Sequence, residues 1–102
     1  LVRILDGDTI DAKIDLGFDV WVKKRIRFLG IDAPETRTRD LEEKQAGLEA
    51  KSRVEALFDA SNGMFVLRSH GVGKYGRVLG EIFIDKVNIN NLLIEEGLAS
   101  KY

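Results

Sequence analysis

Residues 9–14, "TIDAKI", alternate strictly between apolar and charged side chains once past the threonine. A period of two places Ile10, Ala12 and Ile14 on one face of a β-strand and the charged side chains on the other. The turn sequence "DLGFD" follows, and residues 20–29, "VWVKKRIRFL", are rich in the residue types that strands favour. The two segments predict a long hairpin with one buried face, which commits the chain to a fold built on a β-sheet.

Two helices are predicted further along the chain. The first covers residues 41–58, begins at a capping box of Asp40 and Glu43, and is weakened but not ended by Gly47. The second begins after Asn88 as its cap and ends at Gly97. The apolar face of the first helix is expected to contain four side chains: Leu41, Leu48, Val54 and Phe58.

The remaining strands complete a mainly β chain with helices, of the α+β class. "LVRIL", "MFVLRS" and "VLGEIFI" read as strands, which gives the order β-β-β-α-β-β-α. That order predicts a five-stranded barrel with flanking α-helices, the OB-fold being the best-known example. No repeat, linker or low-complexity segment interrupts it, so we expect residues 1–102 to form one domain.

Composition excludes several kinds of site. The chain has 102 residues, no cysteine and one histidine, His70. This excludes a disulfide framework and argues against a conventional zinc site. No apolar run approaches a membrane span and no signal peptide opens the chain. The first residues already read as a strand, so the sequence does not show whether a leader preceded them. The compartment of the protein therefore stays open.

The charge is unevenly distributed. The net charge of −1 argues against a protein that coats nucleic acid by bulk electrostatics. However, residues 20–39 contain six basic side chains and two acids, whereas residues 40–59 contain six acids and three basic side chains. The pattern is compatible with solvated faces of opposite sign or with a local site for an anion.

Two short stretches offer carboxylates. "DGDT", residues 6–9, reads as a tight turn, but the turn does not require Asp8. In "DAPE", residues 32–35, Pro34 disfavours a helical conformation for Ala33 and frees its carbonyl. Carboxylate and carbonyl oxygens are the ligands that Ca²⁺ or Mg²⁺ prefers, although the stretch alone could equally be an acid-decorated turn.

The glycine-rich stretch "GVGKYG", residues 71–76, matches a dinucleotide-binding pattern only in its letters. Such a fingerprint opens a helix, whereas the residues that follow here, "RVLGEIFI", read as a strand. No Ser or Thr follows Lys74, so a Walker A motif is excluded too. The stretch is expected to be a hairpin tip that presents Lys74, Tyr75 and Arg77 at one rim.

Arg27 has two interpretations. Alternation through "RIRFL" places it on the outward face of a strand, where it needs no function. Together with Arg77, two aspartates and a glutamate, it would instead grip phosphate oxygens beside a hard cation and a proton acceptor. That combination is what hydrolysis of a phosphodiester needs.

Three motifs, "DGDT", "RFLGIDAPE" and "KYGR", occur in the order and at the intervals of the staphylococcal nuclease (thermonuclease) family, and "INNLLIEEGLA" is also typical of it. The sequence resembles this family over essentially its whole length. The resemblance implies an OB-fold barrel and a Ca²⁺-dependent endonuclease that cuts DNA and RNA to leave 3′-phosphate ends. It also implies a monomer acting on single strands, without a membrane partner, and favours a secreted or cell-surface location.

The resemblance further implies a metal site and a base. Asp8 and Asp32 would be calcium ligands, joined by the carbonyl of Ala33, where the best-known member of the family has threonine. Glu35 would be the general base or would orient the attacking water.

The other implied roles concern the substrate. Arg27 and Arg77 would bind the scissile phosphate and stabilise the transition state, while Lys74, Tyr75 and Tyr102 would contact the bound strand. With about three phosphates neutralised, we expect a log–log salt slope near −2, from roughly 0.7 per contact.

Two departures and one alternative remain. Residues 9–27 form a longer hairpin than in the best-known member of the family, and the net charge is acidic where that member is strongly basic. The alternative is a non-catalytic OB-fold module that binds single-stranded nucleic acid or a protein. Such a module is expected to have lost at least one of the five charged residues of the implied site. All five are present in this sequence: Asp8, Arg27, Asp32, Glu35 and Arg77.

Overall fold

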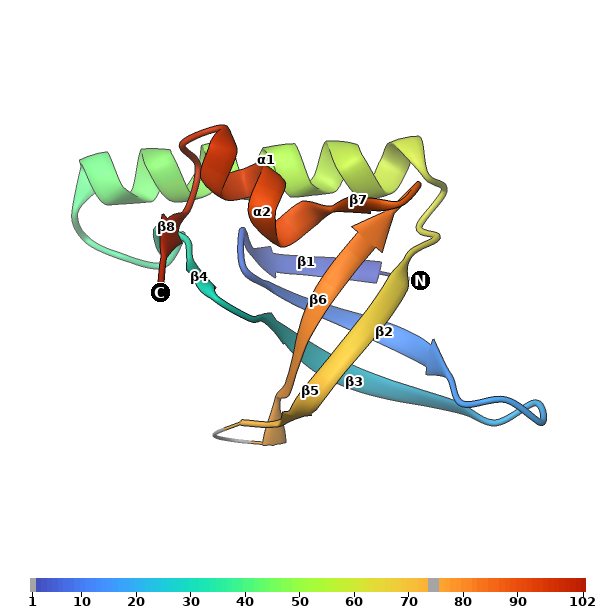
Figure 1. Ribbon diagram of the computed structural model, residues 1–102. Helices are drawn as coiled ribbons and strands as arrows, with labels where there is room; N and C mark the ends of the chain where they lie inside the picture. The colour runs from blue at the N-terminus through green and yellow to red at the C-terminus, as the bar shows by residue number, and fades with distance from the viewer. Residues whose placement is uncertain (1, 74–75) are drawn as a thin grey trace.

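A computed structural model describes residues 2–73 and 76–102. Within these ranges the chain forms a six-stranded sheet, a two-stranded sheet and two helices (Figure 1). The predicted α+β class with flanking helices is confirmed. The longer helix, α1, spans Leu41–Ala60 and lies across the top of the sheet, and α2, Ile89–Glu95, lies beside it.

The large sheet places strands from both ends of the chain next to each other. Its main path runs β1-β2-β3-β6-β5, and all neighbours are antiparallel except β3 and β6, which are parallel. The bounds of these five strands are β1 Val2–Asp6, β2 Thr9–Asp15, β3 Trp21–Phe28, β5 Val66–Val72 and β6 Val78–Ile84. The parallel pair joins the first hairpin to the second in one sheet.

Three two-residue strands are not predicted from the sequence. β7, Val87–Asn88, pairs with β6, while β4, Ile31–Asp32, pairs with β8, Ser100–Lys101. Two residues are too few to show a period, so these strands are fixed by the partners that tertiary structure supplies. The β4–β8 pair matters for the site, because it brings the end of the described chain against Asp32.

The predicted alternation in β2 and β3 is confirmed. Ile10, Ala12, Ile26 and Phe28 are buried, and Ile10 lies opposite Ile26 in the antiparallel register. Ile82 of β6 and Val54 of α1 belong to the same core, with several further apolar side chains. The face of β2 and β3 that points away from this core carries Thr9 and Asp11 opposite Arg27 and Arg25.

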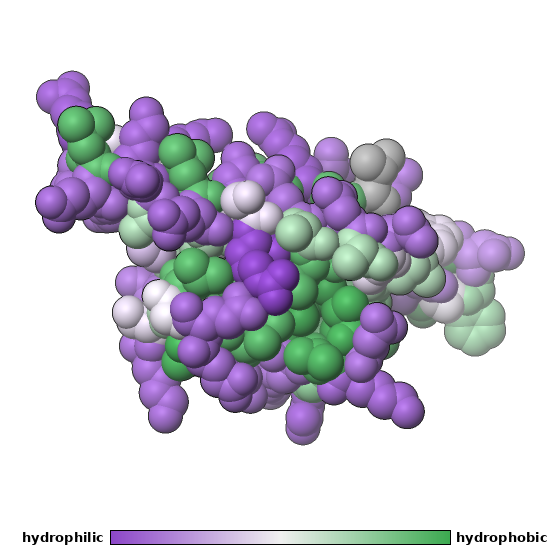
Figure 2. Space-filling model, turned by 90° about the horizontal axis from the view of Figure 1, so that it is seen from above, coloured by the Kyte–Doolittle hydropathy of each residue, from purple (hydrophilic) through white to green (hydrophobic). Residues whose placement is uncertain are grey.

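The β2–β3 hairpin extends beyond the sheet. It projects at the lower right of Figure 1, and hydrophobic colour marks its side chains at the right edge of Figure 2. Leu16, Phe18, Val20 and Trp21 are exposed there, and the turn uses positive φ angles at residues 17–19. The predicted turn in "DLGFD" is thereby confirmed.

The face that α1 buries differs from the predicted one. Asp40 caps the helix as expected, accepting hydrogen bonds from the backbone N–H of Glu42 and Glu43. However, Leu41 and Leu48 are exposed, and the buried residues of the helix are Gly47, Ala50, Val54 and Phe58. At its N-terminal half the helix therefore meets backbone rather than apolar side chains, and that contact needs small residues.

Gly47 shows why. A Cβ atom at this position would lie 2.5 Å from the carbonyl oxygen of Glu35 and 2.8 Å from that of Pro34. A Cβ atom at Gly7 would lie 2.7 Å from the Cβ of Ala50. As predicted, Gly47 does not end the helix. Gly47 lets α1 approach the "DAPE" segment, and Gly7 lets the β1–β2 turn approach Ala50 of the same helix.

Candidate active site

The turn between β1 and β2 meets the segment "DAPE". Asp8 is buried, with 6% of its surface exposed, and its Oδ1 accepts a hydrogen bond of 2.8 Å from the hydroxyl of Thr9. Its Oδ2 accepts a hydrogen bond, also of 2.8 Å, from the backbone N–H of Ala33. Two stretches that are 25 residues apart therefore share one carboxylate.

Arg27 lies between the two aspartates. Its Nη1 is 3.5 Å from Oδ2 of Asp8, and its Nη2 is 3.4 Å from Oδ1 of Asp32. Nη1 also donates hydrogen bonds to the carbonyls of Phe28 and Ile31, at 3.0 and 2.9 Å. Only 15% of the side chain is exposed, so Arg27 is not simply an outward strand residue. Its guanidinium is held where two carboxylates converge.

Tyr102 covers this guanidinium. Its ring centroid lies 5.8 Å from Cζ of Arg27, which is a cation–π distance. The N–H of Tyr102 donates to the carbonyl of Gly30, continuing the pairing of β8 with β4. The ring is otherwise exposed, so a side chain expected to contact substrate lies beside Arg27 with a free face.

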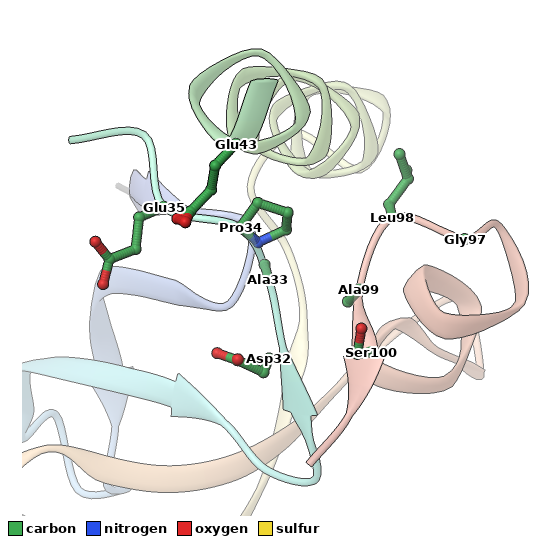
Figure 3. A pocket seen from close by; sticks show the side chains of 9 residues that line it. All are labelled: Asp32, Ala33, Pro34, Glu35, Glu43, Gly97, Leu98, Ala99 and Ser100. Atoms are coloured by element: carbon green, nitrogen blue, oxygen red, sulfur yellow. The ribbon is translucent and has the colours of Figure 1, made fainter. Parts of the chain in front are cut away.

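Glu35 lies at the rim of a cavity of about 470 Å³. In Figure 3, the carboxylates of Asp32 and Glu35 lie on one side of the "DAPE" segment, and Ala99 and Ser100 lie on the other. Glu43 points down from α1 toward the same segment, although the sequence suggests only a capping role for it. The cavity is therefore acidic. The full lining is Asp32, Ala33, Pro34, Glu35, Glu43, Gly97, Leu98, Ala99 and Ser100.

Hydrogen bonds fix the segment on both sides of Glu35. The carboxylate of Asp6 accepts from the hydroxyl of Thr36 at 2.7 Å and from its N–H at 3.2 Å. The buried side chain of Asn90 donates to the carbonyl of Leu29, in the turn before β4, and to that of Gly80 in β6. Asn90 is a positioning residue that sequence reasoning missed, because its partners come from distant segments.

Arg77 lies elsewhere. It lines a second cavity together with Arg3, Arg25, Arg37, Leu5, Asp6 and Thr9. The described strands on either side of this stretch, β5 and β6, pair antiparallel as the predicted hairpin requires. Lys74 and Tyr75 lie outside the described residues. The structure thus brings Asp8, Arg27 and Asp32 together, and places Arg77 in a neighbouring wall.

The donors around Asp8 and Asp32 fit a hard cation. The sequence has no cysteine, and its single histidine, His70, contacts Glu81 on the β5–β6 pair. In residues 2–73 and 76–102, no group of three or more His, Cys, Asp or Glu side chains could hold a metal by itself. Ca²⁺ takes roughly six to eight oxygen ligands. The protein would supply carboxylate oxygens and the carbonyl of Ala33, and waters and a substrate oxygen would supply the rest.

A family model described as staphylococcal nuclease homologue matches residues 25–102. The chain belongs to the staphylococcal nuclease family. The match includes "RFLGIDAPE", "KYGR" and the end of the chain, and the fold described above agrees with it.

Curated relatives are similar over nearly the whole chain. An endonuclease of Bacillus subtilis, SPbeta prophage-derived endonuclease YokF, is 30% identical over 97% of this chain and 32% of its own length. Micrococcal nuclease of Shigella flexneri is 31% identical over 100% of this chain and 56% of its own length. Thermonuclease of Staphylococcus hyicus is 27% identical over 97% of this chain and 56% of its own length. The chain thus spans from about a third to somewhat over half of these relatives. None of its described helices is long and apolar enough to cross a membrane.

Proposed function

We propose that residues 1–102 form one domain that acts as a Ca²⁺-dependent nuclease, cutting DNA and RNA as a monomer and leaving 3′-phosphate ends. Membership of the staphylococcal nuclease family supports the activity. The observation that carries the proposal is the position of Arg27 between Asp8 and Asp32, with Glu35 three residues further along the same segment. A guanidinium that can bind phosphate lies between two carboxylates that can hold a hard cation, and a proton acceptor follows on the same segment as one of them.

Arg27 is prepared to bind phosphate through one edge. Nη1 already donates hydrogen bonds to the carbonyls of Phe28 and Ile31, and these bonds fix the orientation of the guanidinium group. The edge formed by Nε and Nη2 grips two phosphate oxygens, and Nη2 exchanges its loose 3.4 Å contact with Asp32 for a shorter bond. Preorganised charge of this kind is typically worth a few kcal/mol in the transition state.

Glu35 is exposed at the cavity rim and accepts the proton of the attacking water. The water oxygen bonds to phosphorus and the bond from phosphorus to the 5′ oxygen breaks. The leaving 5′ oxygen takes a proton from solvent water, and the phosphate stays on the 3′ end. Asp8, Asp32 and the carbonyl of Ala33 would hold Ca²⁺, whose charge stabilises that developing on the phosphate. Arg77 contacts the same phosphate group from the neighbouring wall.

The test is incubation of the protein with single-stranded DNA and Ca²⁺, followed by analysis of the end groups. We expect 3′-phosphate ends, loss of cleavage in excess chelator, and no restoration by Zn²⁺, because the ligands are hard oxygens. Full activity in excess chelator would contradict the metal site. Binding of the strand without any cleavage would instead favour the non-catalytic module.

A further inference from the structure

The second cavity, of about 550 Å³, is strongly basic. Four arginines line it, and they come from β1, β3, the loop after "DAPE" and the β5–β6 hairpin: Arg3, Arg25, Arg37 and Arg77. Only Arg77 has a proposed role in the reaction. The other three line the same cavity in a protein whose net charge is −1. This local concentration of positive charge favours the binding of an anionic ligand.

Strand register gathers two of these arginines. Arg3 lies opposite Asp11 in the β1–β2 pair, and Asp11 lies opposite Arg25 in the β2–β3 pair. The three form one row across the outward face of the sheet. Arg37 is held nearby because Thr36, the residue before it, is hydrogen-bonded to Asp6, which also lines the cavity.

Two acids, Asp6 and Asp11, lie beside the four arginines and do not balance them. Asp6 lines the cavity, and its carboxylate accepts hydrogen bonds from Thr36. Asp11 is engaged by Arg25 alone, through two hydrogen bonds of 2.8 and 3.1 Å. That contact holds the pKa of Asp11 below its usual value, and the charges of Arg3 and Lys23 add to the effect. Arg3 and Arg37 are exposed and have no ion-pair partner within the described parts of the chain. Two guanidinium groups therefore remain for an anionic ligand.

The cavity adjoins the candidate active site. Thr9 lines the cavity, donates its hydroxyl to Asp8, and lies opposite Arg27 in the β2–β3 register. Arg25 is two residues from Arg27 along β3, which is about 7 Å in an extended strand. A chain of phosphates that has one member at Arg27 can therefore place the next in the arginine cavity.

We propose that Arg3, Arg25 and Arg37, which line this cavity beside Arg77, form a subsite for the backbone phosphates next to the one that is cut. This subsite rests on the proposed function for its substrate class, a nucleic-acid strand. Guanidinium forks suit phosphate oxygens, and contacts to phosphate add affinity without reading sequence. With Arg3 and Arg37 added to the three contacts expected from the sequence, about five phosphates are bound, and the salt slope becomes about −3.5.

The test uses the double substitution Arg3→Gln and Arg37→Gln. Both side chains are exposed and unpaired, so their loss leaves the fold intact, whereas Arg25 and Arg77 are left unchanged because each has a partner. The matched control is Lys44→Gln with Lys51→Gln, which removes the same charge from α1 away from the cavity. Binding of a labelled single-stranded 12-nucleotide DNA is measured in chelator at several salt concentrations.

We expect the double variant to bind about tenfold more weakly at low salt and to have a slope of about −2, while the control keeps the wild-type slope near −3.5. An unchanged slope in the double variant would overturn the subsite. So would equally tight binding of a poly-glutamate peptide of the same charge, because the cavity would then be a general anion site.

Cleavage assays separate this inference from the proposed function. With Ca²⁺, the double variant should cut a dinucleotide at the wild-type rate and lose efficiency only on longer strands, through a higher KM. If the wild-type protein cuts nothing but the slopes still differ as expected, the proposed function fails and the phosphate subsite stands. If dinucleotide cleavage falls as much as cleavage of long strands, the arginines do not form a separate subsite.

Discussion

The two cavities beside the β1–β2 turn are opposite in charge. One is lined by Asp32, Glu35 and Glu43, and the other by four arginines. Asp8 connects them, because its carboxylate accepts one hydrogen bond from Ala33 in the acidic cavity and another from Thr9 in the basic one. The contrast fits the proposed division of labour, in which the acidic cavity carries out the chemistry together with Arg27 and Arg77, while Arg3, Arg25 and Arg37 of the basic cavity bind the neighbouring phosphates.

Among the variants considered, Glu35→Gln should lower the cleavage rate most. The amide keeps the volume of the side chain but accepts no proton, so we expect the rate to fall by about 10² or more while binding of the strand stays nearly intact. Single-turnover cleavage at saturating protein measures the rate, and binding in chelator measures affinity. Glu43→Gln is the control within the same cavity. Wild-type cleavage by the Glu35 variant would remove Glu35 from its role.

Arg27→Lys should have the next largest effect. An ammonium group cannot reproduce the bidentate fork or the two bonds to the carbonyls of Phe28 and Ile31. We expect the single-turnover rate to fall by about tenfold or more. Arg68→Lys, on the exposed face of β5, serves as the matched control. A variant with wild-type turnover would show that Arg27 only supports the turn before β4.

Gly47→Ala tests how the acidic cavity is positioned. The added methyl group collides with the carbonyl of Glu35, so the backbone must shift, and we expect a loss of about 1–3 kcal/mol in unfolding free energy together with slower cleavage. Chemical denaturation measures the first effect. Ser52→Ala, on the exposed side of α1, should change neither. A gain in stability at Gly47, as helix propensity alone would give, would contradict this close approach.

The smallest expected effect concerns the salt bridge behind the acidic cavity. Arg53 of α1 binds Glu96 through two hydrogen bonds of 2.7 and 2.9 Å, and Glu96 precedes Gly97 in the cavity wall. The hydrogen bond from Arg53 lowers the pKa of Glu96 below its ordinary value of 4.5. The stabilisation is therefore present above pH 4.5 and is lost as the pH falls through the folded-state pKa.

Because both side chains are partly exposed, the pair stabilises the fold only weakly, and Glu96→Gln should lower the Tm at pH 7 by only about 2–4 °C. The difference from wild type should shrink as the pH falls below 4.5 and vanish once Glu96 is protonated in both states. A difference that grows on acidification would mean that the pair is not what stabilises this wall. Glu95→Gln is the control.

The acidic cavity could be predicted in large part because its chemistry is local. Asp32, Ala33 and Glu35 come from four consecutive residues, and the proline among them restricts the backbone. The β2–β3 hairpin could also be predicted, because a period of two is visible in the sequence.

The basic cavity could not be predicted in the same way. It depends on the register that places Arg3, Asp11 and Arg25 in one row, and no single stretch of sequence contains that information. For the same reason the two-residue strands β4 and β8, the partners of Asn90 and the contact at Gly47 were missed. Each of them is set by a segment that is distant in the sequence.

The division of labour is tested most directly by a single comparison of two variants. Single-turnover cleavage of a single-stranded 12-nucleotide DNA with Ca²⁺ is followed as protein concentration is raised, for Glu35→Gln and for the double variant Arg3→Gln with Arg37→Gln. We predict that the Glu35 variant saturates at the wild-type concentration but about 10² more slowly, and that the arginine variant reaches the wild-type rate at about tenfold higher concentration. If the two variants change the same parameter, the cavities do not have separate roles.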